Sequence, residues 1–451
     1  MTKKLIITVF IVLLVLLALL ARYPLSRYYY NKGLENRQDE LYEKSLACFS
    51  RAVKLRSSFI EARFEEAVAY AIMDMDSMAI ERFSVINEID DGYAKAWFNR
   101  GISYYVTGEY EKSLDDFTRS AELGYEQALS YTHRGKALQS LDYRDEAMKS
   151  FSKAIALDPG LGQAWFHRGV LKANLGDFAG AVEDYNMAIR YDGENPELYQ
   201  LRGNTMASLD NFINAVEDYD RLIEMDADYT GAYKQRGIFK RQISDYSGAI
   251  DDLNMALKID PGDAETYYHR GSSFASIGQL EKAREDFDRS IRLDSTSGRY
   301  FLNRGLALLR LGQAREARQD LNTAVVLDPA NPQAFYLLGT ARAMLQDYSG
   351  SIDEFSRALA LDESHAMAYF NRGISRGIIG VHEEAIKDFD RSLELQSDNP
   401  GAYLQRAVSR INVNDMDGGC EDLHTALEMG MTDAESMLRM YCSSRGNVII
   451  R

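Results

Sequence analysis

The chain has 451 residues, of which 46% are hydrophobic and 27% are charged, so it carries enough apolar material for a packed core and is not a disordered protein. Its 52 Lys and Arg residues are outnumbered by 68 Asp and Glu residues. The resulting charge of −16 excludes a non-specific nucleic-acid binder, because such proteins gain affinity from Lys and Arg contacts to phosphates. The three cysteines, Cys48, Cys420 and Cys442, contain no CxxC pair, which excludes a zinc knuckle and a thioredoxin-type motif.

The chain begins with an apolar segment, residues 5–21, in which only Thr8 is polar. As a helix its 17 residues span about 25 Å, which is short for a membrane crossing but longer than the apolar core of a usual signal peptide. A signal-peptide cleavage site needs small residues at −3 and −1, whereas cleavage after Ala21 would place Leu19 at −3. We therefore predict a signal anchor in residues 1–25 that crosses the membrane through residues 5–21, and a cleaved signal is the alternative.

The charges on the two sides of this segment are nearly balanced, with Lys3 and Lys4 before it and Arg22, Arg27 and Lys32 after it. The positive-inside rule therefore orients it only weakly. We expect a single-pass membrane protein whose N-terminus lies in the cytoplasm and whose remaining residues lie outside it. In that compartment Cys420 and Cys442 are able to pair.

A period of 34 residues accounts for the rest of the chain. The tetrapeptide Ala94-Lys95-Ala96-Trp97 matches Gly162-Gln163-Ala164-Trp165 at twice this distance, and the pattern extends both ways without an insertion or deletion. Residues 26–433 are thereby divided into twelve repeats, which begin at residues 26, 60, 94, 128, 162, 196, 230, 264, 298, 332, 366 and 400.

Several repeat positions carry one residue type throughout. Position 4 is aromatic in eleven repeats, position 8 is Gly or Ala, position 20 is small, and position 24 is Phe, Tyr or Leu. The three-and-four spacing puts positions 4, 8 and 11 on one face of a first helix and positions 20, 24 and 27 on one face of a second. Six of the seven prolines stand at positions 1 or 32, and Pro24 ends the apolar segment, so no proline is expected to interrupt a helix.

This pattern resembles the tetratricopeptide repeat (TPR) family over residues 26–433. The resemblance implies an all-α fold, a right-handed superhelical solenoid of antiparallel helix pairs, here preceded by a transmembrane helix. It also implies that the first helices line a concave groove that binds protein or peptide partners. Residues 434–451 are predicted to form a capping helix and a tail, with Thr432 and Glu435 as a capping box and Met437, Leu438, Met440 and Tyr441 covering the last repeat.

Two charged columns run through the repeats. Position 7 is Arg in nine repeats and position 23 is Asp in eight, and every one of those Asp residues shares its repeat with an Arg. Repeat 2 reverses the signs, with Glu66 and Arg82, so we predict direct Arg–Asp pairs, within a repeat or between neighbours. Position 11 departs from the family with Lys or Arg in five repeats, which either pack less tightly or pair with acids on the second helix: Lys172, Lys240, Arg342, Arg376 and Arg410.

Position 6 supplies the candidate binding residues, because it is Asn, Gln or His in nine repeats and these groups both donate and accept hydrogen bonds. The arrangement resembles the asparagine ladder of the O-linked N-acetylglucosamine transferase superhelix, which implies contacts to a peptide backbone. Aromatic residues at position 5 add to this surface, and some of them pack between helices. The alternative is a solvated helix face. The predicted groove residues are Asn31, Asn99, His133, His167, Gln235, His269, Asn303, Asn371 and Gln405.

No catalytic or metal-binding motif is present in the sequence. No phosphate-binding loop, zinc-protease motif or nucleophile elbow occurs, and His133, His167 and His269 fall in different repeats, so neither a metal nor a cofactor is expected. We therefore predict a non-enzymatic, membrane-anchored scaffold for protein or peptide partners. The alternatives are an exported soluble assembly factor or chaperone with a cleaved signal, and a non-catalytic subunit that recruits an enzyme.

Overall fold

The computed structural model describes the backbone of residues 2–442, and their side chains except those of residues 2–6, 12–20 and 230. These residues form 25 α-helices and no strand, which confirms the all-α prediction. The tail that follows residue 442 lies outside the described residues. The chain divides into two compact units, Met1–Met225 and Asp226–Arg451.

In chain order the helices are α1 (Thr2–Gln38), α2 (Tyr42–Leu55), α3 (Ile60–Ile72), α4 (Asp76–Ile89), α5 (Ala94–Val106), α6 (Tyr110–Glu122), α7 (Gln127–Ser140), α8 (Arg144–Leu157), α9 (Gly162–Asn174), α10 (Phe178–Tyr191), α11 (Pro196–Ala207), α12 (Phe212–Met225), α13 (Thr230–Gln242), α14 (Tyr246–Ile259), α15 (Ala264–Ser276), α16 (Leu280–Leu293), α17 (Gly298–Arg310), α18 (Ala314–Leu327), α19 (Pro332–Met344), α20 (Tyr348–Leu361), α21 (Ala366–Ile378), α22 (His382–Leu395), α23 (Pro400–Asn412), α24 (Met416–Glu428) and α25 (Asp433–Tyr441).

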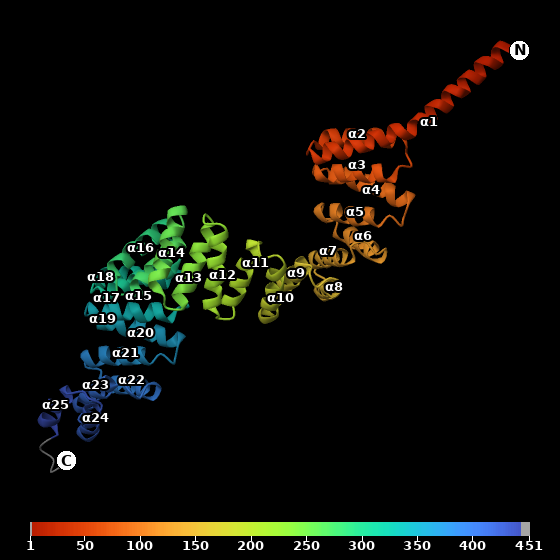
Figure 1. Cartoon of the computed structure of the whole chain (residues 1–451). Coiled ribbons are helices and arrows are strands. Elements are labelled where there is room, and N and C mark those ends of the chain that lie inside the picture. The colour runs from red at the N-terminus through yellow and green to blue at the C-terminus, as the bar shows by residue number, and fades with distance from the viewer. Residues whose placement is uncertain (1, 443–451) are drawn as a thin grey trace. The chain divides into compact units, whose positions relative to one another are not determined.

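Within each unit the helices form successive antiparallel pairs, in which an odd-numbered first helix packs against the second helix that follows it (Figure 1). The second helix in turn packs against the first helix of the next pair. Local sequence sets the helix starts. Asp177, for example, caps α10 by accepting a hydrogen bond of 3.0 Å from the Gly180 N–H, and Pro332 occupies the first turn of α19.

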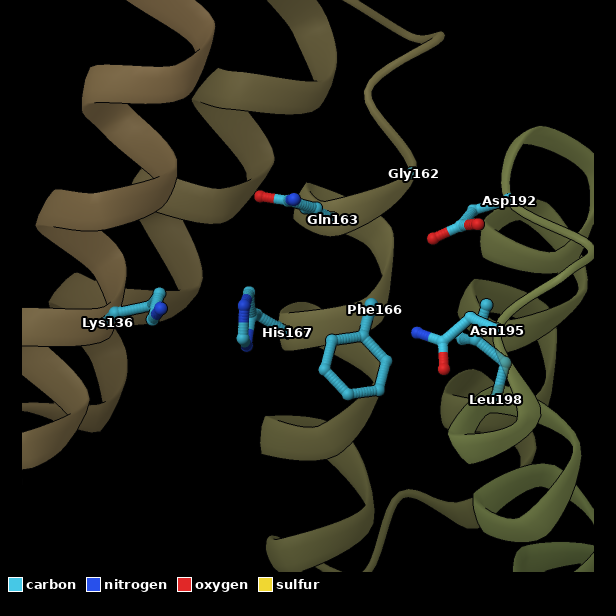
Figure 2. A pocket seen from close by; sticks show the side chains of 8 residues that line it. All are labelled: Lys136, Gly162, Gln163, Phe166, His167, Asp192, Asn195 and Leu198. Carbon is cyan, nitrogen blue, oxygen red and sulfur yellow. The ribbon is translucent and has the colours of Figure 1, made fainter. Parts of the chain in front are cut away.

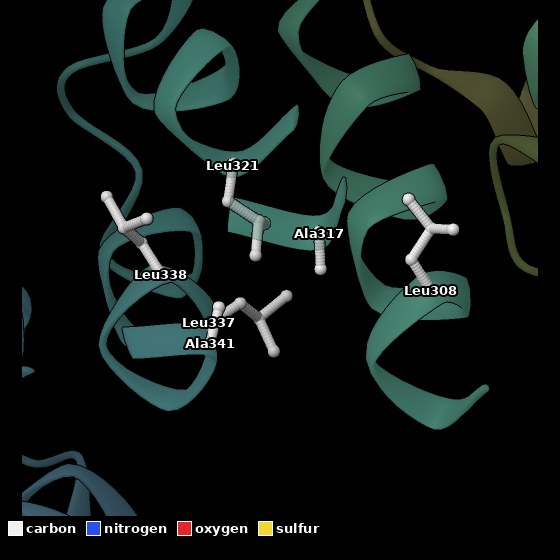
Figure 3. Close-up of a cluster of buried hydrophobic side chains, with 6 residues drawn as sticks. All are labelled: Leu308, Ala317, Leu321, Leu337, Leu338 and Ala341. Atoms are coloured by element: carbon white, nitrogen blue, oxygen red, sulfur yellow. The ribbon is translucent and has the colours of Figure 1, made fainter. Parts of the chain in front are cut away.

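The small residues at position 8 allow the two helices of a pair to approach closely. A Cβ atom added to Gly135 on α7 would lie 2.5 Å from the Phe151 ring of α8. Residues of two successive pairs then share one core. Figure 3 shows such a cluster in the second unit, where the residues come from α17, α18 and α19: Leu308, Ala317, Leu321, Leu337, Leu338 and Ala341.

Helix α1 contradicts one prediction, because Pro24 lies inside it rather than ending it. Proline removes one backbone hydrogen-bond donor, and here the surrounding residues 21–25 are exposed, so water is able to satisfy the carbonyl left without a partner. The apolar segment and the first helix of the first repeat are therefore one continuous helix (Figure 1). Among the described residues, no helix combines the length and the apolar character needed to cross a membrane.

The C-terminal helix α25 packs on the last pair through Ala434, Met437 and Leu438, which join the cluster that includes Leu404 and Leu423. Two details of the prediction are wrong. Met440 and Tyr441 are 72% and 41% exposed. The Thr432 side chain makes no capping hydrogen bond, because its own backbone is already helical (φ −61°, ψ −26°) rather than extended.

A disulfide between Cys420 on α24 and Cys442, the residue after α25, holds this cap in place. The two Cα atoms are 5.9 Å apart. The sequence analysis expects this pairing for a chain that is exported from the cytoplasm.

Candidate functional site

The nine predicted groove residues all lie on first helices, four in the first unit and five in the second. Asn31 is exposed, whereas the other eight are partly buried. Position 6 is therefore not simply a solvated helix face. Four of these side chains contact the first helix of the preceding repeat, and we call this line of contacts the seam at position 6. The imidazoles and the amides behave differently there. The nine residues are Asn31, Asn99, His133, His167, Gln235, His269, Asn303, Asn371 and Gln405.

In the first unit, the imidazoles stack on aromatic rings of the preceding repeat. His133 lies over Phe117 with ring centroids 5.1 Å apart and an interplanar angle of 25°, and His167 lies over Phe151 at 6.0 Å and 19°. Burial, assisted by the Lys136 charge, lowers the pKa of His133 to about 4 and that of His167 to about 3. Both rings are therefore neutral at pH 7, each with one donor and one acceptor nitrogen.

A cavity of about 200 Å³ lies beside His167 (Figure 2). Lys136 of α7 and His167 of α9 point toward each other at one side, and Asp192 and Asn195 lie at the other. Phe166 stands between them. A hollow of this size, with an apolar ring and groups of both charges, suits a side chain of a bound peptide. The full lining is Lys136, Gly162, Gln163, Phe166, His167, Asp192, Asn195 and Leu198.

In the second unit, His269 contacts a cation that the sequence analysis did not single out. Arg241 on α13 lies with Nη1 2.9 Å from His269 Nδ1, so the neutral imidazole accepts a hydrogen bond from the guanidinium. Burial, and then the Arg241 charge, lowers the pKa of His269 to about 4. In the part of the chain that the structure describes, no carboxylate pairs with Arg241, and its Nε is buried without a hydrogen-bond partner.

Arg241 is therefore an uncompensated, partly buried cation on a first helix of an acidic protein. Burial lowers the pKa of its guanidinium, which is the expected effect of a charge that lacks a counterion. The signal in the sequence was present but weak. Position 12, where Arg241 stands, is Ala or Gly in half of the repeats, and Arg37 is the other cation there. Arg37, unlike Arg241, is paired, with Glu65.

Three amides at position 6, those of Asn99, Asn303 and Asn371, donate hydrogen bonds through their N–H groups. Asn99 donates to the Lys95 carbonyl of its own helix at 2.8 Å. Asn371 donates to the Tyr336 hydroxyl of the preceding repeat at 3.1 Å. Over the described residues, no hydrogen bond uses the Oδ1 atoms of these two amides, which leaves them as acceptors for a ligand.

Aromatic residues at position 5 pack between helices, and one of them, Phe166, also lines the cavity beside His167. Phe98 is 6% exposed and packs against Phe117 with ring centroids 5.6 Å apart. Tyr336 packs in the same way against Phe355 at 5.9 Å. The expectation that some of these rings lie between helices is confirmed.

The charged columns form the predicted pairs. In each of eight repeats the guanidinium at position 7 contacts the carboxylate at position 23 of the same repeat, with shortest N···O distances of 2.5 to 2.8 Å. The arginine also reaches back to the preceding repeat, as Arg304 does to Asp288 at 2.7 Å. The pairs are Arg100–Asp116, Arg168–Asp184, Arg202–Asp218, Arg236–Asp252, Arg270–Asp286, Arg304–Asp320, Arg372–Asp388 and Arg406–Asp422.

The five cations at position 11 take the second of the two predicted roles, because each contacts the acid at position 23. Lys172, for example, lies 3.0 Å from Asp184, and Arg342 lies 3.1 Å from Glu354. The same holds for Lys240, Arg376 and Arg410.

The sign-reversed pair of repeat 2 does not form. Glu66 instead accepts a hydrogen bond of 2.6 Å from Ser50, and the Arg82 Nε is buried without a partner. The shorter reach of a carboxylate on the first helix explains the difference, since a guanidinium at position 7 is long enough to span the pair.

Three models described as tetratricopeptide repeat match the chain over residues 26–59, 94–126, 128–161, 162–195, 264–297 and 302–366, which together make up more than half of it. The chain belongs to the tetratricopeptide repeat family. Members of this family are protein-interaction scaffolds that bind protein or peptide partners. No curated protein sequence matched the chain significantly.

Solved structures are also similar to this TPR chain. The APC/C hetero-tetramer Cut9–Hcn1 is 14% identical, with 92% of this chain and 96% of that chain covered and a TM-score of 0.44. YrrB, described as a TPR protein with an unusual peptide-binding site, is 22% identical, with 42% and 96% covered and a TM-score of 0.38. A TPR protein from Parabacteroides merdae is 16% identical, with 55% and 98% covered and a TM-score of 0.41.

Proposed function

We propose that the chain is a membrane-anchored, non-enzymatic scaffold that binds extended peptide segments of partner proteins along its first helices. The single observation that carries the proposal is the seam at position 6. It combines neutral imidazoles, amide oxygens that no hydrogen bond of the described residues uses, and a cavity of about 200 Å³ beside His167. Such groups suit a peptide backbone with little regard for its sequence.

The repeat array proposed here has twelve members between residues 26 and 433, with the right-handed twist typical of the family. The helix starts support this number. From α3 to α23 the first helices begin at positions spaced 34 residues apart, except that α7 begins one residue early, at Gln127. The family models match single repeats in the same register, for example residues 26–59 and 162–195.

Peptide binding is tested on an array of immobilised extended peptides. Peptides bound by the wild-type chain are measured again with the Asn303→Ala/Asn371→Ala variant. Each lost hydrogen bond is worth about 1 kcal/mol, so affinity is expected to fall about tenfold or more. The control is Gln319→Ala/Asn322→Ala, which removes two exposed amides from the second helix α18. Equal affinities for both variants would remove the position 6 residues from the binding site.

The proposed anchor is the segment 5–21, and the proposed location of the repeats is outside the cytoplasm. The Cys420–Cys442 disulfide supports this side, because disulfides persist in oxidising compartments. Sequencing the mature N-terminus and extracting membranes with alkaline carbonate separate the anchor from a cleaved signal. A chain that begins near residue 22 and leaves the membrane would favour the soluble assembly factor, and co-purification with an enzyme would favour the recruiting subunit.

A further inference from the structure

The end of the first repeat that lies next to the apolar segment is strongly basic. Residues 22–30 and 51–63 contain six cations and one carboxylate, Glu61, in a chain whose net charge is −16. Residues 31–50, at the other end of the same helix pair, contain four carboxylates and three cations. We call the six cations the basic collar: Arg22, Arg27, Arg51, Lys54, Arg56 and Arg63.

The fold brings the two parts of the collar together. Helix α2 runs antiparallel to α1, so its C-terminal end returns to the start of the repeat. The Arg56 guanidinium lies 4.6 Å from the centre of the Tyr23 ring, and Arg51 lies 5.6 Å from that of Tyr29. Arg63 donates a hydrogen bond of 2.6 Å to the Ser57 carbonyl, which holds α3 to the same end.

The collar is not neutralised within the protein. None of its six cations forms an ion pair with a carboxylate in the part of the chain that the structure describes, whereas Lys32 and Arg37, at the other end of the pair, both do. Arg22, Arg27, Arg51 and Lys54 are exposed. Arg27 and Arg56 stack on rings, at 5.9 Å and 5.2 Å from Phe59. Stacking uses the flat face of a guanidinium and leaves its edge N–H groups available for an anion.

The position of the collar relative to the apolar segment is fixed by the continuous helix. Because α1 passes through Pro24 without ending, Tyr23 lies two residues beyond Ala21, which is about 3 Å along the helix axis. The headgroup layer of a bilayer is about 5 to 8 Å thick on each side. Arg56, beside Tyr23, is therefore at headgroup level when the apolar segment crosses the membrane. Tyr23 and Tyr28, 62% and 60% exposed, add rings of the kind that favour this layer.

We propose that the basic collar binds the headgroups of anionic phospholipids and thereby holds the first repeat against the membrane surface. This inference rests on the proposed anchor, since the anchor sets the height of the collar. Charge complementarity identifies the occupant, because cations close to an anionic leaflet are each attracted to it, and the exposed rings fit an interface rather than a soluble anion.

The test uses the full-length chain in lipid nanodiscs, either of neutral phosphatidylcholine or with about one third phosphatidylglycerol. A bimane fluorophore is attached at Ser58→Cys, in the exposed loop after α2, in a Cys48→Ser background. Lipids with a spin label on the headgroup quench the fluorophore when the loop touches the membrane. We expect stronger quenching in the anionic discs, and its loss in about 0.5 M salt, where the Debye length is only a few ångströms. A label at Gln38→Cys, at the other end of α1, is expected to be insensitive to lipid charge.

Two variants assign the effect to the collar. Each cation near an anionic surface raises the equilibrium constant for membrane contact about fivefold. Lys54→Gln/Arg56→Gln is therefore expected to lower the equilibrium constant for contact of the first repeat with the membrane about thirtyfold. The matched control, Lys44→Gln/Lys149→Gln, removes two exposed lysines elsewhere and is expected to leave the quenching unchanged. The comparison of quenching at low and high salt uses the labelled chain without these substitutions. A folding defect in either double variant therefore leaves that comparison valid.

The outcomes separate the collar from the anchor. Quenching that is equal in neutral and anionic discs, while the chain stays in the discs at alkaline pH, would overturn the collar and keep the anchor. A chain that stays only on anionic discs, and only at low salt, would keep the collar and overturn the anchor. Positive flanks favour the cytoplasmic side of a membrane and the disulfide favours the opposite side. The nanodisc has no sidedness, so it tests lipid binding independently of that question.

Discussion

The guanidinium of Arg100 on α5 and the carboxylate of Asp116 on α6 are joined by two parallel hydrogen bonds, both of 2.8 Å. The same arginine donates from Nη1 to Ser84 of the preceding repeat at 2.9 Å, and stacks on Trp97 at 4.7 Å. Burial alone would lower the pKa of Arg100, but Asp116 raises it. One side chain thus joins two helices of its own repeat to the repeat before it, which supports a structural role for the arginine column.

Asp116→Asn is therefore expected to destabilise α5 and α6. Asp116 is 2% exposed, and loss of its charge leaves a partly buried guanidinium without a counterion, at a cost of about 3 kcal/mol. Hydrogen exchange of the α5 and α6 amides measures this locally, which suits a repeat array that does not unfold in two states. The neighbouring Asp115 is exposed, so Asp115→Asn is the control. If both changes have equal and small effects on exchange, the Arg100–Asp116 pair contributes no more stability than a solvent-exposed ion pair.

Repeat 2 offers the reverse experiment, because its sign-reversed residues do not pair. Glu66→Arg/Arg82→Asp restores the arrangement of the other repeats, and Ser50 is already placed to contact the new arginine. The Arg82 Nε, now buried without a partner, disappears in this variant. We expect slower exchange of the α3 and α4 amides, by a factor that corresponds to about 1 kcal/mol. The single change Glu66→Arg, which places two arginines together, should instead speed exchange.

The sequence was sufficient to predict the pairing of charged residues because the repeats provide many independent examples of one geometry. A column in which Arg at position 7 always accompanies Asp at position 23 has one simple explanation, and the five extra cations at position 11 follow the same rule. Glu66 and Arg82 show where this reasoning stops. Their opposite charges fit the pattern, but contact depends on which of the two helices carries the longer side chain. The residue types at the two positions do not give the distance that the side chains must span.

The candidate site was predicted less completely than the fold. The spacing predicts that His133, His167 and His269 lie on first helices. It does not predict that each ring contacts a side chain from another helix. The sequence predicts a helix end at Pro24, because proline is in general disfavoured in helix interiors. An exposed helix, however, tolerates the loss of one backbone hydrogen bond. Arg241 was missed because a lack of counterions becomes visible only when every nearby carboxylate has been placed. Burial and pairing across repeats are three-dimensional properties.

Arg241→Met is expected to stabilise the second unit, because it removes a charge that is partly buried and unpaired while it keeps the apolar stem. The gain should be about 1 kcal/mol. A second readout is specific to the contact seen here. Since the Arg241 charge helps to lower the pKa of His269, loss of that charge should raise the His269 pKa above about 4, as NMR of labelled histidine measures. Arg310→Met, at an exposed arginine of α17, is the control and should leave that pKa in place.

Acid should weaken the chain through its buried histidines. In the folded chain the pKa of His167 is about 3 and those of His133 and His269 are about 4, whereas a histidine in an unfolded chain titrates near 6.5. The unfolded state therefore binds more protons as the pH falls below about 6.5, and folding free energy is lost from there down to the folded pKa values. Each ring contributes up to about 1.4 kcal/mol per pH unit.

His167→Gln should make this pH dependence shallower by about one proton between pH 6 and pH 4, with little effect on its slope above pH 7. The pH dependence of the unfolding free energy is measured by urea denaturation at several pH values, with hydrogen exchange of the α8 and α9 amides as the local readout. The exposed His424 gives the matched control, His424→Gln. If the two variants have the same pH profile as the wild type, burial of His167 does not set its titration.

Reduction of the Cys420–Cys442 disulfide should loosen α25 without unfolding the repeats. The bond closes a loop with a sequence separation of 22 residues, and a loop of this length is worth about 3 kcal/mol in the chain-entropy account. The remaining contacts of the cap are few, with Ala434 fully buried and Met437 and Leu438 partly so. Exchange of the amides in Asp433–Tyr441 is therefore expected to rise steeply in reductant, while that of α21 and α22 stays unchanged. Cys442→Ser should reproduce the effect without reductant, and Cys48→Ser, at the half-buried free cysteine, should not. A cap that keeps its protection after reduction would assign its stability to the apolar contacts with Leu404 and Leu423 instead of the disulfide.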